Sequence, residues 1–173
     1  MSKGFVLVVG AVVVVVLAVA VPSLLRARLS PGEAPWIGDT RTVISAQTAY
    51  AAANGGFYDG RLQCLSEPST CIPGYTRAAP IFLDPALASL QTKSGYKRFL
   101  YPGPPASRDD IASAKASPTS VRGFAYVAVP AEADTGRRAF CGDASGIVCF
   151  TPDGTMPKVE DGRCPVPACT VLQ

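Results

Sequence analysis

The sequence predicts an α+β fold in which one long N-terminal helix packs on an antiparallel sheet of three or four strands. Three observations lead to this prediction. An uncharged apolar run occupies residues 5–21, and a helical apolar period follows it from Trp36 to Asn54. In the second half of the chain, short apolar segments alternate with glycine, proline and aspartate, which is typical of strands joined by turns.

Length and charge limit the function classes. The chain has 173 residues, and about 120 remain after the apolar N-terminal run and its helical continuation, which is enough for one modest core. The formal net charge of +3 comes from Lys3, Arg26 and Arg28, because the part from Glu33 onward has equal numbers of acidic and basic residues. A neutral domain lacks the clustered basic surface of nucleic-acid binding proteins, so we expect no nucleic-acid partner.

The chain contains no histidine. Ser-His and Cys-His nucleophilic catalysis and imidazole general-base chemistry are therefore excluded. No other residues gather into a catalytic pattern, so we expect no enzyme activity, no cofactor and no catalytic residue.

Six cysteines all follow the apolar run: Cys64, Cys71, Cys141, Cys149, Cys164 and Cys169. An even number placed beyond a membrane-directed segment predicts disulfides in an oxidising compartment. The spacings contain no C-x-x-C pair, so a metal site is not predicted.

The cysteine spacing suggests pairings. Cys64 and Cys71 close a short loop and form the economical local bridge. For the other four, one alternative joins Cys141 to Cys149 and Cys164 to Cys169. The other joins Cys141 to Cys164 and Cys149 to Cys169; it closes longer loops, anchors the tail and is favoured by chain entropy.

The apolar run admits two plain interpretations. Its 17 residues span roughly 26 Å as a helix, near the lower limit for crossing a bilayer. With Lys3 before it and Ala18-Val19-Ala20 near its end, it has the form of a secretory signal peptide. It also has the form of a single-span anchor.

After Pro22 the helix can resume. Ser30 suits an N-cap, with Pro31 at the first helical position and Glu33 as the capping-box partner. Because Gly32 and Pro35 weaken this first turn, we expect a kink or break between Arg28 and Trp36, with a simple loop as the alternative. The amphipathic helix that follows ends at Asn54-Gly55-Gly56, where glycine suits a left-handed cap.

Four segments are predicted to be strands: 95–101, 123–129, 137–142 and 147–151. The last two flank Asp143-Ala144-Ser145-Gly146, which suits a type I turn closed by a glycine bulge. That register places Cys141 opposite Cys149 on one face. The segment 102–122 is expected to be a long surface connection, with a partner-facing loop as the alternative.

Four carboxylates toward the C-terminal end suit turns: Asp143, Asp153, Glu160 and Asp161. Calcium binding is the alternative interpretation of the same side chains, and turn chemistry explains them more simply. The prolines between Cys164 and Cys169 prevent a core strand there, so this end is expected to be a coil held by cross-links.

Several stretches carry a family resemblance. They are Lys3-Gly4-Phe5 before the apolar run, and then 21–30, Glu33-Ala34, 37–47, 50–56, 123–131, 135–141 and 146–148. Together they cover about half of the chain, and they resemble type IV pilins and the related pseudopilins of type II secretion systems.

The resemblance implies a domain organisation. Residues 1–4 form a short leader that a prepilin peptidase removes between Gly4 and Phe5. Residues 5–29 form a transmembrane and filament-core helix, 30–56 an amphipathic helix that continues into the head, and 57–173 a globular β domain.

The implied function is structural. The chain would be a subunit of a pilus-like filament, held in the bacterial inner membrane before assembly and then carried to the cell surface or the periplasm. Its partners would be identical or related pilin subunits, contacted through the N-terminal helix, together with the inner membrane and the peptidase.

The sequence departs from the family pattern in two ways. The family has a glutamate five residues into the mature chain, where this sequence has Val9, or Phe5 when counted back from Pro22. The apolar run is also about one helical turn short. These departures favour a diverged or minor subunit. The alternatives are a type II secretion pseudopilin, a minor adhesive pilin, and a secreted disulfide-rich domain released by signal peptidase.

Overall fold

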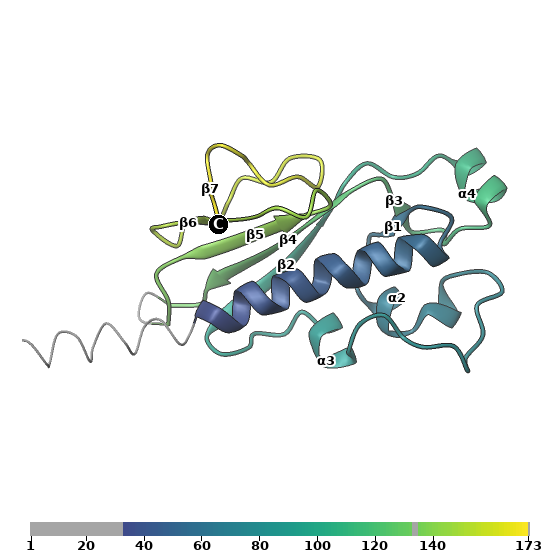
Figure 1. Ribbon diagram of the computed structural model, residues 1–173, viewed down its shortest axis with the longest axis horizontal. Helices are drawn as coiled ribbons and strands as arrows, with labels where there is room; N and C mark the ends of the chain where they lie inside the picture. The colour runs from purple at the N-terminus through teal and green to yellow at the C-terminus, as the bar shows by residue number, and fades with distance from the viewer. Residues whose placement is uncertain (1–32, 133–134, 173) are drawn as a thin grey trace, which may run out of the picture.

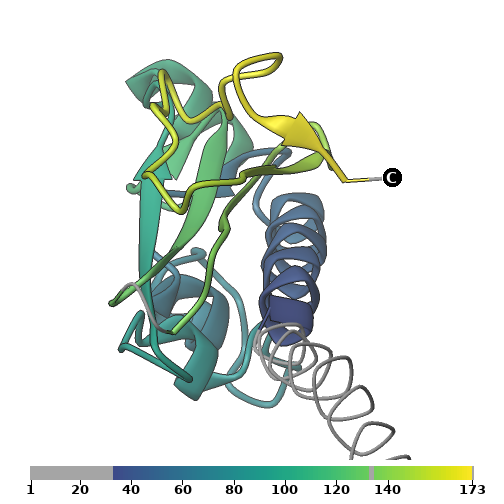
Figure 2. The same ribbon diagram turned by 90° about the vertical axis from the view of Figure 1, so that its left-hand side faces the viewer.

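The computed structural model describes residues 33–132 and 135–172. The fold is α+β: a helix over residues 33–53 lies along one side of an antiparallel sheet (Figures 1 and 2). The predicted cleavage position at Gly4-Phe5, the apolar run and the predicted cap at Ser30 lie outside the described residues. Within those residues, none of the helices has the length and apolar character needed to span a membrane.

The main sheet has five strands in the order β2-β4-β5-β6-β7, with every neighbouring pair antiparallel. The strands are β2 (Tyr96–Pro102), β4 (Phe124–Pro130), β5 (Ala139–Asp143), β6 (Val148–Thr151) and β7 (Thr170–Val171). The first four match the predicted strands. The sheet has one strand more than the upper predicted count of four, because the edge strand β7 has only two residues, too few to give a sequence pattern.

The β5–β6 hairpin has the predicted register. Cys141 pairs with Cys149 and Gly142 with Val148. Gly146 has a φ of 81°, and its N–H donates to the carbonyl of Asp143 at 3.0 Å. Glycine is needed at this position because other residues rarely adopt positive φ.

The helix over residues 33–53, called helix 33–53 below, packs tightly on the sheet. Trp36, Val43 and Tyr50 are fully buried, as their helical spacing predicts. The ring of Trp36 stacks on that of Tyr96 in β2, with centroids 4.8 Å apart. The helix ends as predicted: Gly55 has a φ of 64°, and the Gly56 N–H donates to the Ala51 carbonyl at 2.8 Å.

A single glycine sets how closely helix 33–53 approaches β5. A Cβ atom on Gly142 would lie only 2.4 Å from Thr40 Cγ2 and 2.9 Å from Ile44 Cδ1. The absence of a side chain at this position therefore allows the helix to rest directly on the strand.

The segment 102–122 is not the bare connection that the sequence predicts. It contains α4 (Arg108–Ala114) and β3 (Ser120–Val121), and β3 pairs with β1 (Tyr58–Asp59) in a second, two-stranded sheet. Helix α4 forms because Ser107 and Asp110 make a complete capping box. Three further short elements lie between β1 and β2: α2 (Gln63–Ser66), η1 (Pro68–Thr70) and α3 (Pro85–Ala88).

The two faces of the main sheet have separate cores. Helix 33–53 and the 62–88 region cover one face, around Val43, Tyr50 and Phe124. On the other face Val127 and Val129 pack with the four cysteines of β5, β6 and the tail. The C-terminal tail thus covers the face of the sheet that the helix leaves free.

Candidate functional site: the helix surface and its anchors

The face of helix 33–53 that points away from the sheet consists almost entirely of small side chains. Its exposed residues are Ala34, Pro35, Gly38, Arg41, Thr42, Ser45, Thr48, Ala49, Ala52 and Ala53. Only Arg41 has a long side chain. We call this set the small-residue face.

Such a surface allows close approach of another helix. Interfaces between helices in lipid, where dispersion and packing drive association, are enriched in glycine, alanine, serine and threonine. The small-residue face repeats every three or four residues, so it forms one stripe along the helix. A second helix laid along it would meet no bulky obstacle except Arg41.

One anchor fixes the first described turn of helix 33–53 to the sheet. The Glu33 carboxylate accepts hydrogen bonds from the backbone N–H groups of Arg137 and Arg138 at 3.2 Å each, and its other oxygen pairs with the Arg138 guanidinium at 2.5 Å. The guanidinium also lies over the Phe140 and Phe150 rings, 5.5 and 4.9 Å from their centroids. Ser30, the predicted capping partner of Glu33, lies outside the described residues; within them the Glu33 carboxylate binds Arg137 and Arg138.

A second anchor fixes the C-terminal half of the helix through the fully buried Asp59 of β1. Its carboxylate accepts hydrogen bonds from the Tyr50 hydroxyl at 2.9 Å and from the Thr119 hydroxyl at 2.7 Å. The Gln47 amide pairs with the Asp59 backbone, donating to its carbonyl at 2.9 Å and accepting from its N–H at 3.1 Å.

Asn54 extends this anchor to β3. Its side-chain nitrogen donates to the Phe57 carbonyl and to the Ser120 hydroxyl, both at 2.9 Å, while its oxygen accepts from the Ser117 N–H at 2.7 Å. Helix 33–53 is therefore bound to the rest of the described fold by polar contacts near both of its ends and by apolar packing between them.

Burial perturbs the tyrosines beside the helix. Desolvation, followed by the negative charge of Asp59, holds the pKa of Tyr50 far above its ordinary value. Desolvation also raises the pKa of Tyr96 to about 12, with a smaller contribution from Glu33. These hydroxyls stay protonated at physiological pH, so they serve as hydrogen-bond donors rather than as acids or bases.

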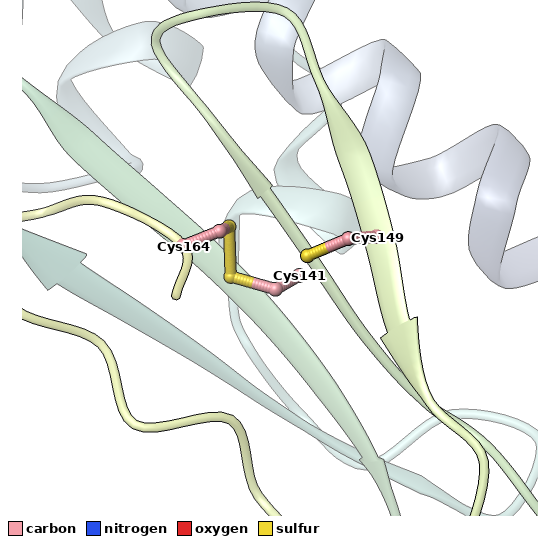
Figure 3. Close-up of side chains that lie close together, drawn as sticks. All are labelled: Cys141, Cys149 and Cys164. Atoms are coloured by element: carbon pink, nitrogen blue, oxygen red, sulfur yellow. A yellow bond between two sulfur atoms is a disulfide. The ribbon is translucent and has the colours of Figure 1, made fainter. Parts of the chain in front are cut away.

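The cysteines form three disulfides: Cys64–Cys71, Cys141–Cys164 and Cys149–Cys169. This is the pairing that the loop-length argument favoured. The sulfurs of Cys141, Cys149 and Cys164 all lie within 4.8 Å of one another (Figure 3). A cysteine binds a metal ion as its thiolate, and these three sulfurs are all bonded in disulfides, so they are not available as metal ligands.

Two of the four C-terminal carboxylates have the turn roles that the sequence predicts. Asp143 accepts from the Ser145 N–H at 2.9 Å and from the Cys164 N–H at 2.7 Å, which also ties the tail to the hairpin. Asp153 accepts from the Thr155 hydroxyl at 2.7 Å, and this bond lowers its pKa. Over the described ranges, Asp143, Asp153, Glu160 and Asp161 do not gather into a group that could hold a metal ion.

Neither the small-residue face nor the Asp59 network was predicted from the sequence. The helical period that marks the buried stripe also marks the opposite stripe of small residues. The sequence therefore contained a signal from which the small-residue face could have been predicted. The Asp59 network joins residues about 60 positions apart in the chain, and no local pattern encodes such a contact. Comparison of the chain with protein-family models, with curated proteins and with solved structures finds no match.

Proposed function

We propose that this protein is a structural subunit of a type IV pilus-like filament, held in the bacterial inner membrane before assembly. The observation that carries the proposal is the small-residue face. It is an open, sterically undemanding stripe on a helix that is anchored to its head near both ends. The resemblance of the N-terminal region to prepilins supports the same assignment.

The mechanism follows from the two surfaces of the helix. The apolar run 5–21 would hold the subunit in lipid and then exchange lipid for the apolar helices of neighbouring subunits. The small-residue face would continue this contact outside the membrane. Since neither Val9 nor Phe5 supplies a carboxylate, subunit contacts in the filament core would depend on packing rather than on an ion pair.

The mature N-terminus tests the processing step. Mass spectrometry of the protein from its native host should find a chain that begins at an N-methylated Phe5. A chain that begins at Val21 would instead identify a secreted domain released by signal peptidase.

Substitutions on the small-residue face test the assembly step. We expect Ala49→Arg to abolish recovery of the subunit in sheared surface filaments, because the long charged side chain blocks helix approach. Ala78→Arg, at an exposed loop position away from the helix, is the matched control and should assemble normally. Circular dichroism should show both variants folded, and normal assembly of Ala49→Arg would contradict the proposal.

A secreted disulfide-rich domain is the second candidate. It is favoured by the globular part itself, in which three disulfides and three apolar clusters form a core from residues of the described ranges alone. This candidate predicts no filament association, so the same shearing experiment separates the two functions.

A further inference from the structure

We infer that the four cysteines of β5, β6 and the tail form a disulfide-exchange site with two alternative pairings, for which the co-reactant is a small thiol. The inference is independent of the filament proposal. In the structure, Cys141–Cys164 and Cys149–Cys169 bind the tail to the sheet. In the exchanged pairing, Cys141–Cys149 would cross-link the hairpin and Cys164–Cys169 would close within the tail.

The geometry brings the exchanging sulfurs together. Cys141 and Cys149 are directly opposite each other on adjacent antiparallel strands. Such partners have Cα atoms about 4.5–5.5 Å apart, within the range that a disulfide spans. The sulfurs of Cys141, Cys149 and Cys164 lie within 4.8 Å of one another, so the Cys149 sulfur is next to the bond that it would attack (Figure 3).

The tail sequence permits the second new bridge. The chain turns back between Cys164 and Cys169, where the Val166 N–H donates to the Cys164 carbonyl and the Cys169 N–H donates to the Pro165 carbonyl, both at 2.9 Å. The two cysteines therefore belong to one tight loop.

The exchange needs no net oxidant or reductant. Cys169 is buried, so the tail opens locally to admit the small thiol. Its thiolate attacks the Cys169 sulfur and forms a mixed disulfide, and the electron pair of the broken bond stays on Cys149. The Cys149 thiolate then attacks the Cys141 sulfur and expels Cys164 as a thiolate. Finally, Cys164 attacks the mixed disulfide on Cys169 and regenerates the small thiol, so two disulfides are present before and after.

The two disulfide pairings differ in whether they bind the C-terminal tail to the sheet. In the structure the tail is covalently bound to the sheet and β7 covers the edge of β6. After exchange, noncovalent contacts alone would keep it there: hydrogen bonds such as that from the Leu172 N–H to the Val148 carbonyl, and the apolar packing of Cys164 and Cys169 on the sheet. A two-residue strand with exposed side chains is a weak attachment, so the exchanged form would release the tail and uncover β6.

Trypsin distinguishes the pairings directly. It cleaves after Arg138, Lys158 and Arg163, so Cys141 and Cys149 fall in one peptide, 139–158, and Cys164 and Cys169 in another, 164–173. With the pairing in the structure, the two peptides remain joined. With the exchanged pairing they separate, and each carries an internal disulfide.

The experiment incubates the folded, oxidised full-length protein with reduced and oxidised glutathione at neutral pH, followed by acid quench, alkylation and non-reducing digestion. We expect the separated, internally bridged peptides to accumulate to a plateau. A Cys149→Ser/Cys169→Ser variant is the control, and its two peptides should stay joined through Cys141–Cys164. Persistence of the joined peptides in the wild type, or their conversion only to fully alkylated linear peptides, would overturn the inference.

Global unfolding could also scramble disulfides, so the rate is measured at increasing urea below the unfolding transition. Local exchange predicts a rate that changes little with urea and leaves the Cys64–Cys71 bridge intact. A rate that rises as steeply as global unfolding, or equal scrambling of Cys64 and Cys71, would contradict an exchange site built into the fold.

Discussion

Asp59 shows how much one buried side chain determines in this molecule. It is fully buried and accepts hydrogen bonds from the hydroxyls of Tyr50 and Thr119 and from the Arg61 N–H. A carboxylate is costly to bury unless it is bonded in this way. The same contacts join helix 33–53 to two strands that have little core of their own.

Removal of the Asp59 side chain should therefore leave the buried Tyr50 hydroxyl and two part-buried donors, the Thr119 hydroxyl and the Arg61 N–H, without this acceptor. We expect Asp59→Ala to lower the free energy of unfolding by about 1–3 kcal/mol, measured by urea denaturation. Asp109→Ala, at an exposed position of α4, should change it by less than about 0.5 kcal/mol. If Asp59 acts through Tyr50, then adding Tyr50→Phe to Asp59→Ala will cost less than it does in the wild type. Equal losses from the two aspartate variants would show that the network contributes nothing.

At the scale of elements, the contact between helix 33–53 and β5 depends on a position without a side chain. Gly142 lies under Thr40 and Ile44. A Cβ atom added to Gly38, on the outer face of the helix, would meet no atom of the described residues within 4 Å apart from its own stretch of helix backbone. The two glycines thus provide a matched pair for one methyl group.

Gly142→Ala should destabilise the protein by about 1–3 kcal/mol, because the added carbon overlaps the helix and forces it away from the strand. Gly38→Ala should instead raise stability by about 0.5–1 kcal/mol, since alanine is the better helix former and meets no obstacle. Urea unfolding monitored by circular dichroism measures both. A neutral Gly142→Ala would mean that the helix and sheet are separated more easily than their packing indicates.

Elements formed by interactions between residues close in sequence were predicted better than those formed by contacts between distant residues. Periodicity located helix 33–53 and four strands, and the Asp143–Gly146 turn fixed the hairpin register, because these signals lie within a few neighbouring residues. Loop entropy selected the correct disulfide pairing between two alternatives. Helix α4 was missed although Ser107 and Asp110 have capping-box spacing, because the surrounding prolines favoured a loop.

The candidate site was less predictable from sequence than the fold. The anchors of helix 33–53 pair Glu33 with Arg138 and Tyr50 with Asp59, and only the tertiary structure brings such residues together. The small-residue face lacks any distinctive side chain, so it becomes visible only when the opposite face is known to be buried.

At the scale of the whole molecule, buried tyrosines predict a loss of stability in alkaline solution. Burial raises the pKa of Tyr96 and of Tyr126 to about 12, from an ordinary value near 10. Above pH about 10 the unfolded chain loses these protons while the folded protein keeps them. The unfolded state then binds fewer protons, so the free energy of unfolding falls as the pH rises from about 10 toward 12.

Tyr126→Phe tests this prediction. Among the described residues, the Tyr126 hydroxyl has no partner in hydrogen-bonding geometry, although the nearby Arg98 guanidinium offsets part of the effect of burial on its pKa. We expect the variant to match or exceed the wild type at pH 7 and to lose less stability between pH 9 and 11, measured by urea unfolding under non-reducing conditions. Parallel pH profiles for the two proteins would refute this contribution of Tyr126.

The placement of the two polar anchors has a mechanical consequence. Glu33 and Asn54 are roughly 30 Å apart along the helix at about 1.5 Å per residue. A pull along the helix axis therefore loads both attachments at once, in shear, instead of peeling the helix from the sheet one contact at a time. Helix 33–53 and the sheet would therefore move together as one rigid body. Tension applied at the N-terminal end of the helix would reach the sheet without first detaching the helix.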